Sequence, residues 1–100
     1  MNEKKFVSRI PKLRKNQIYV LQLTYNYHYQ LEGVYKNINL ILRKLAYRNA
    51  IHLQDMKFYH RPKSNDYIIQ IKTSSNKWLK DIAMVTIAEI DSVGLILFNF

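Results

Sequence analysis

The chain of 100 residues contains no cysteine, two glycines and two prolines. The lack of cysteine excludes disulfide bonds, Cys-ligated zinc sites, iron–sulfur clusters and thiol nucleophiles. Because Gly33 and Gly94 are the only glycines, a glycine-rich phosphate-binding loop is excluded as well. No apolar run approaches the roughly 18–20 residues that cross a bilayer, and the first 17 residues hold no apolar stretch of signal-peptide length. We therefore expect a cytoplasmic protein without a membrane partner.

Acidic residues are also scarce, since seven Asp and Glu face sixteen Lys and Arg, a formal net charge of +9. Residues 1–17 carry six basic residues and one acidic residue, against ten and six in residues 18–100. A basic segment beside a less basic domain is typical of binding to a polyanion, because neutralised phosphates release counterions. The alternative is a solvated, frayed terminus. We expect a basic N-terminal arm at 1–16 and a single α+β domain at 17–100.

The composition supports a folded core, because 48% of the residues are apolar. Asn, Ile, Lys and Tyr together supply 40 of the 100 residues. Their codons are rich in A and T, which favours a low-GC bacterium, its phages or its mobile elements as the source. This usage also accounts for part of the lysine content.

Two segments rich in β-branched and aromatic residues predict strands at about 17–27 and 66–73, and the alternation of apolar and polar residues predicts a third at about 53–60. The turn composition of residues 61–66 predicts a hairpin between the last two strands. Apolar residues at spacings of three and four predict a helix over about 30–48. Its apolar stripe consists of Leu31, Val34, Ile38, Leu42 and Leu45.

A second helix is predicted at about 76–90, after the candidate N-caps Ser74, Ser75 and Asn76, and the chain closes with a strand in VGLILFNF. The order β-α-β-β-α-β predicts a ferredoxin-like split βαβ fold, a four-stranded antiparallel sheet with two helices on one face. A winged-helix-like α+β domain is the alternative, and it gains weight if 84–90 is a strand.

Alternation along the strands separates an apolar row, which faces the helices, from a polar row. The apolar rows contain Tyr19, Leu21, Leu23 and Tyr25 in the first strand, Met56 and Phe58 in the second, and Tyr67, Ile69 and Ile71 in the third. The open face is then polar and basic, as in either a solvated sheet or a binding surface. We expect it to display Gln22, Thr24, Lys57, Tyr59, Gln70 and Lys72.

The basic residues of the arm, of the first helix and of the hairpin suit phosphate contacts, and a neighbouring exposed Tyr suits base stacking. We therefore predict a small non-catalytic protein that binds DNA or RNA, such as an accessory factor of replication, of a phage or of a mobile element. The candidate nucleic-acid-binding residues are Lys12, Arg14, Lys15, Arg43, Lys44, Tyr47, Arg48, Lys57, Tyr59, Arg61, Lys63 and Lys72.

Two short segments resemble motifs of known families. IYVLQL at 18–23 resembles the RNP2 hexamer of RNA-recognition-motif domains, which share the expected topology. The partner octamer of that family carries glycine and two ring residues, whereas SNDYIIQI at 64–71 has one Tyr and no Gly. Alternation also turns Tyr19 toward the core. The resemblance therefore transfers no stacking role.

His28-Tyr29-Gln30 resembles the His-hydrophobe-Gln motif of rolling-circle replication nucleases, which implies a divalent metal and a downstream Tyr nucleophile. No acidic residue clearly completes such a metal shell, and the separate His52 and His60 lack acidic companions. No nucleophile–base–orienter set appears either. We expect neither catalysis nor a metal or other cofactor.

The apolar C-terminus is typical of an edge strand that is covered or that pairs with another chain. The alternative function is therefore a small accessory or inhibitory protein that docks on a larger, acidic protein, or on a second copy, by strand addition. Packing against the protein's own helices is the other interpretation. The candidate partner-binding residues are Leu95, Leu97, Phe98 and Phe100.

Overall fold

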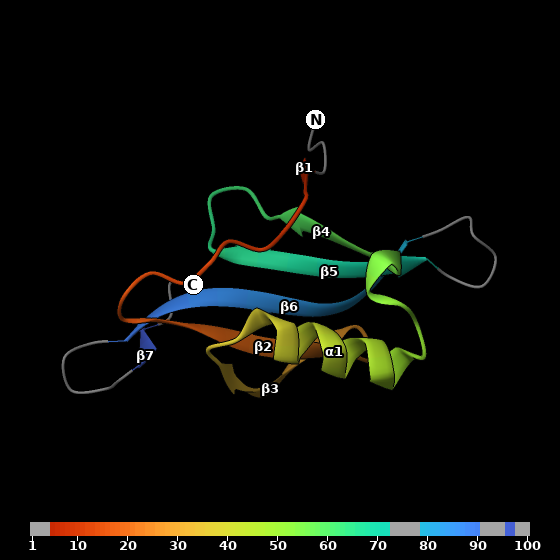
Figure 1. Ribbon diagram of the computed structural model, residues 1–100, viewed down its shortest axis with the longest axis horizontal. Helices are drawn as coiled ribbons and strands as arrows, with labels where there is room; N and C mark the ends of the chain where they lie inside the picture. Colours follow the sequence, from red (N-terminus) through yellow and green to blue (C-terminus); the bar gives the residue numbers. More distant parts are fainter. Residues whose placement is uncertain (1–4, 73–78, 91–95, 98–100) are drawn as a thin grey trace.

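The computed structural model describes residues 5–72, 79–90, 96 and 97. In this part of the chain, one α-helix lies against a seven-stranded antiparallel sheet (Figure 1). The strand order is β1-β4-β5-β6-β2-β3, and β7 pairs with the end of β6. The elements are β1 (Lys5–Val7), β2 (Gln17–Tyr25), β3 (His28–Tyr35), α1 (Ile38–Asn49), a 3₁₀ turn (Leu53–Asp55), β4 (Met56–His60), β5 (Asp66–Lys72), β6 (Leu79–Ile90) and β7 (Ile96–Leu97).

The ferredoxin-like prediction is wrong, because the described chain is mostly β-structure with a single α-helix. The predicted helix over 30–48 survives only in its C-terminal part. Residues 28–35 instead form β3, which pairs with β2 through the two-residue turn Asn26-Tyr27, whose φ angles are 48° and 69°. Positive φ at both positions is the geometry of a type I′ hairpin turn. Sequence reasoning missed this turn because it contains no glycine.

The second predicted helix is also wrong, since 79–90 is the long central strand β6, paired with both β5 and β2. The register shifts at Ile69/Gln70. Ile69 pairs with Ala83 and Gln70 with Asp81, so Ile82 forms a β-bulge without a partner on β5. Ile82 and Ala83 consequently both join the apolar core. This bulge imitates a helical spacing. With one helix in the described residues, the winged-helix-like alternative is wrong as well.

The helix α1 has clear local causes at both ends. The Asn37 side chain caps the N-terminus by accepting a hydrogen bond of 2.9 Å from the Asn39 backbone. At the other end, Ala50 adopts a left-handed conformation, with φ of 53°, and its N–H reaches the carbonyls of Ala46 and Tyr47. Arg48 in the last turn complements the negative end of the helix dipole.

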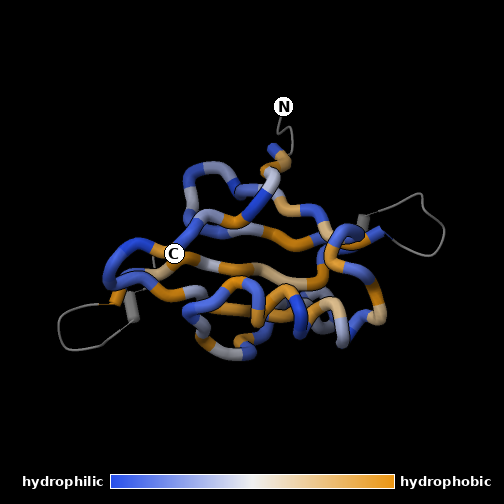
Figure 2. The backbone as a smooth tube through the Cα atoms, viewed as in Figure 1, coloured by the Kyte–Doolittle hydropathy of each residue, from blue (hydrophilic) through white to orange (hydrophobic). Residues whose placement is uncertain are grey.

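The apolar core lies between the sheet and a layer made of α1 and the segment 8–16. Ile41 and Leu45 of α1 and Ile10 of the segment are buried in one cluster with the inward rows of the strands. The predicted inward rows are confirmed except at Tyr25, which is 63% exposed at the end of β2. The other members belong to this cluster or pack against it: Tyr19, Leu21, Leu23, Met56, Phe58, Tyr67, Ile69 and Ile71. We call this side of the sheet the covered face. Figure 2 shows the hydrophobic residues concentrated in the central strands.

We call the opposite side of the sheet the open face. Tyr29 of β3 and Gln70 of β5 line one cleft on this side, although β2 and β6 lie between the two strands. Val20 and Ile68 are buried there although no described helix covers them.

The strand predicted at the C-terminus is described only at 96 and 97, where β7 pairs with Glu89 and Ile90 of β6. Leu97 thus lies in β7. The other candidate partner-binding residues, Leu95, Phe98 and Phe100, lie outside the described residues. Within the part of the chain that is described, no helix has the length and apolarity needed to cross a membrane.

Candidate nucleic-acid interface

The layer over the covered face is rich in positive charge. We call α1 and the segment 8–16 together the cationic cover, and neither contains an Asp or Glu. Both lie on the same side of the sheet, because Ile10 and Leu13 of the segment join the same apolar cluster as Ile41 and Leu45 of α1, and Figure 1 shows β6 between the two. All basic residues of the cover are exposed: Arg9, Lys12, Arg14, Lys15, Arg43, Lys44 and Arg48.

Specific bonds hold the segment 8–16 in place on the sheet. The buried Tyr19 of β2 donates its hydroxyl proton to the Pro11 carbonyl at 2.6 Å, and burial raises the pKa of this phenol above its ordinary value. The Arg14 N–H donates to Gln17 Oε1 at 2.7 Å. The predicted basic arm is thus, over residues 8–16, a fixed part of the surface.

Few of these cations have a carboxylate partner. Of the fourteen Lys and Arg residues in the described part of the chain, only Lys44 and Arg61 form ion pairs, with Glu32 and with Asp66. Lys44 donates a hydrogen bond to Glu32 Oε1. The Tyr35 hydroxyl donates a second one to Glu32 Oε2, at 2.7 Å. These hydrogen bonds lower the pKa of the Glu32 carboxyl. The other six cations of the cover remain available to an external anion.

Tyr47 stands among the cations of α1 and is 92% exposed. Arg43 and Lys44 precede it by four and three residues, so both cations lie beside the ring on the surface of the helix. A ring held in this way is able to stack on a base while the neighbouring cations contact phosphates. The structure thus brings together seven of the predicted binding residues, namely Lys12, Arg14, Lys15, Arg43, Lys44, Tyr47 and Arg48.

The other five predicted residues lie elsewhere. Lys57 and Tyr59 project from β4 onto the open face, where Phe6 lies edge-on to Tyr59 and the Lys57 ammonium sits 5.6 Å from the Phe6 ring. Arg61 reaches Asp66 at 3.6 Å. Lys63 and Lys72 lie in the β4–β5 turn and at the end of β5. These five residues do not belong to the cationic cover.

A row of polar side chains crosses the open face from β4 to β3. Lys57 pairs with Gln70, and Gln70 with Asp81, in the strand register. Gln70 Nε2 donates to Asp81 Oδ1, and the Thr24 hydroxyl donates to the Asp81 backbone carbonyl at 3.0 Å. Thr24 in turn pairs with Tyr29 in the β2–β3 hairpin. Five successive strands therefore each contribute one polar residue to the row.

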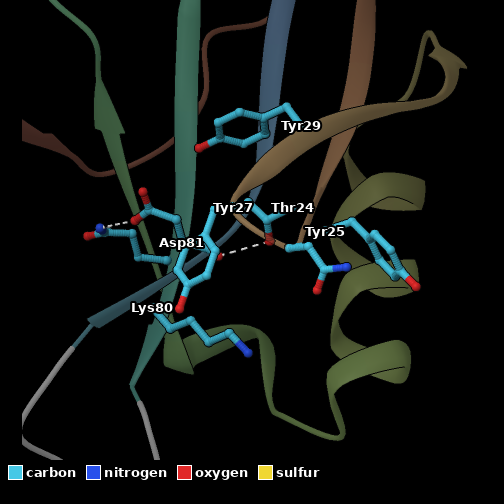
Figure 3. A pocket seen from close by; sticks show the side chains of 8 residues that line it. Thr24, Tyr25, Tyr27, Tyr29, Lys80 and Asp81 are labelled. Carbon is cyan, nitrogen blue, oxygen red and sulfur yellow. Dashed lines mark hydrogen bonds between the residues drawn. The ribbon is translucent and has the colours of Figure 1, made fainter.

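A cleft with a volume of about 680 Å³ opens over one end of this row, a size typical of small-ligand sites. We call it the tyrosine cleft. Figure 3 shows Tyr27, Tyr29 and Asp81 around the same space, with Lys80 at its margin and Tyr25 on the side of α1. The lining residues are Thr24, Tyr25, Asn26, Tyr27, Tyr29, Gln70, Lys80 and Asp81.

Tyr29 is a neutral hydroxyl at physiological pH. Burial, followed by the nearby Asp81 carboxylate, raises its pKa to about 12. The phenol therefore keeps its proton and is able to donate a hydrogen bond to a ligand in the cleft. Asp81 is able to accept a hydrogen bond from such a ligand, because Gln70 engages only its Oδ1 within the described residues.

Gln70 is the one buried polar residue of the described core, at 1% exposure. Its orientation is fixed, because the reversed amide would set Oε1 against the Asp81 carboxylate. In this orientation Oε1 has no hydrogen-bond partner among the described residues. An unsatisfied buried acceptor costs about 1–3 kcal/mol. The described fold thus encloses one unsatisfied acceptor at Gln70, behind the wall of the tyrosine cleft.

Sequence reasoning did not find Tyr27, Tyr29, Lys80 or Asp81 as site residues, because it placed their segments in or next to helices. Tyr29 was considered only as part of the His28-Tyr29-Gln30 tripeptide. The described residues hold no group of three His, Cys, Asp or Glu able to bind a metal. Tyr19, at 2% exposure, faces the core, as the alternation of its strand predicted. No family model, curated protein or solved structure matches this chain.

Proposed function

We propose that the protein binds nucleic acid without catalysing a reaction, and that the cationic cover contacts the phosphates. One observation carries the proposal. The two segments over the covered face hold seven exposed basic residues and no acidic residue, and only Lys44 among them has a carboxylate partner in the described chain. Such a surface attracts a polyanion and gains free energy by releasing its counterions.

The arrangement of the cover supports a phosphate role further. Segment 8–16 is anchored through Ile10 and the Tyr19–Pro11 hydrogen bond, so its cations are held in place before binding. Less conformational entropy is then lost when they bind an anion. Tyr47 adds a ring for stacking beside Arg43 and Lys44. We further propose an accessory role in the cytoplasm, in replication or on a mobile element, which the high content of Asn, Ile, Lys and Tyr favours.

Matched triple variants test the proposal. Replacement of Lys12, Arg14 and Lys15 by Ala removes three cations from the cover, and replacement of Lys5, Lys57 and Lys63 removes three from other surfaces. In fluorescence anisotropy with a labelled oligonucleotide, we expect the first variant to reduce the slope of log affinity against log salt by about 2–3, and the second to change it little. Equal effects of the two variants, or none, would contradict the proposal.

A second candidate function is docking on a larger, acidic protein by strand addition. The observation that favours it is the free edge of β3, which pairs only with β2 in the described chain and exposes Leu31 and Val34. The same anisotropy experiment separates the two candidates. A folded protein that binds no oligonucleotide at low salt would leave docking as the favoured function.

A further inference from the structure

We propose that the tyrosine cleft binds a single guanine base, unstacked from a single-stranded nucleic acid. The inference rests on the proposed function and adds the base that the protein recognises. Phosphate contacts hold a strand without regard to its sequence, whereas contacts to the edge of a base provide selectivity. The cationic cover suits the first task, and the tyrosine cleft suits the second.

The rings of the cleft suit the face of a base. Tyr27 lies at the tip of the β2–β3 hairpin and is 104% exposed, so its ring has no packing role within the described fold. Tyr29 forms a second, less exposed ring beside it (Figure 3). Exposed aromatic rings next to a polar wall are the usual stacking platform for unpaired bases. A base within a duplex is stacked and paired, so the cleft needs a single strand.

The polar groups suit the edge of guanine in particular. The Asp81 carboxylate accepts hydrogen bonds, and guanine offers two adjacent donors, N1–H and the 2-amino group. The neutral Tyr29 hydroxyl and the Lys80 ammonium are donors, and guanine offers the O6 acceptor. Adenine, cytosine and thymine do not present two donors next to an acceptor in this pattern.

The cleft adjoins the cationic cover. A smaller hollow of about 270 Å³ shares Thr24 and Tyr25 with the tyrosine cleft, and its lining includes Arg48 of α1. A strand whose phosphate contacts Arg48 is therefore within reach of the cleft. One strand is thus able to occupy the end of α1 and the cleft together.

The test compares labelled oligothymidine with the same strand carrying one central guanine. At fixed salt, we expect the guanine strand to bind roughly tenfold more tightly. Asp81→Asn should abolish this preference while leaving the affinity for oligothymidine and its salt slope unchanged. Asp66→Asn is the matched control, because it also removes one negative charge from the open face of the sheet, at a position outside the cleft. It should retain the preference.

Two further arms guard against loss of fold in the Asp81 variant. Tyr29→Phe removes only the hydroxyl donor, and hypoxanthine in place of guanine removes only the 2-amino group. Each should reduce the preference severalfold. Salt-dependent binding without a guanine preference, or with one that these changes leave intact, would overturn the cleft assignment and spare the proposed function. Absence of binding to any strand at low salt would overturn both.

Discussion

The two faces of the sheet bury apolar residues in different ways and carry polar groups in different states. On the covered face, α1 and segment 8–16 seal a continuous core and present cations, of which only Lys44 pairs with a carboxylate among the described residues. On the open face, Gln70, Asp81 and Thr24 are already hydrogen-bonded to one another. Unpaired cations suit non-specific attraction, whereas a preorganised polar row suits selection among ligands. Under the proposed function, the covered face therefore supplies affinity for phosphates and the open face supplies selectivity among bases.

The largest expected effect tests whether α1 seals the covered face. Leu45 is 1% exposed within the core, whereas Leu40 on the same helix is 53% exposed. We expect Leu45→Ala to reduce the free energy of unfolding by about 2–5 kcal/mol, because it leaves a cavity. Leu40→Ala should change it by less than about 0.5 kcal/mol. Urea denaturation measures both, and similar values would contradict the description of the covered face.

A smaller effect separates stability from binding on the open face. Tyr27 adopts a φ of 69° in the hairpin turn, where glycine is favoured. We expect Tyr27→Gly to stabilise the fold by about 0.5–1 kcal/mol, because it relieves the left-handed conformation and removes no packing. The same change should weaken oligonucleotide binding by the loss of a stacking ring. A destabilised variant, or one with unchanged affinity, would contradict the role given to Tyr27.

The smallest effect concerns the ion pair between Lys44 of the cover and Glu32. Hydrogen bonds from Lys44 and Tyr35 lower the pKa of Glu32. This stabilisation is present above the ordinary carboxyl pKa and is lost as the pH falls through the lowered value in the folded protein. Thermal melts of Glu32→Gln should therefore fall slightly below those of the natural protein at pH 7 and converge with them in acid. A constant difference in melting temperature across this pH range would contradict the role given to the hydrogen bonds of Glu32.

The sequence predicted three strands and their inward residues because simple alternation holds there, as with Met56 and Phe58 on β4. It failed where bulges disturb alternation. In β3, the register shift at Leu21/Gln22 places Leu31 and Val34 on the same face at a spacing of three. In β6, the bulge places the adjacent Ile82 and Ala83 in the same core. Each bulge interrupts the alternation of its strand, and each interruption contributed to the prediction of a helix there.

The candidate site also has one part that the sequence predicted and one part that it did not. The cations of the cover were predictable because Lys12, Arg14 and Lys15 are close in sequence and Arg43 to Arg48 share one helix. The tyrosine cleft was not, because it joins Thr24, Tyr29, Gln70 and Asp81 from four strands. Only the strand order and the bulges place those residues together.

The salt dependence of binding to a labelled single strand tests the central claim most directly. If the cationic cover contacts several phosphates, the logarithm of the association constant should fall with log salt at a slope of about −3 to −6. A flat response, or no binding at low salt by a protein that circular dichroism shows to be folded, would contradict the account.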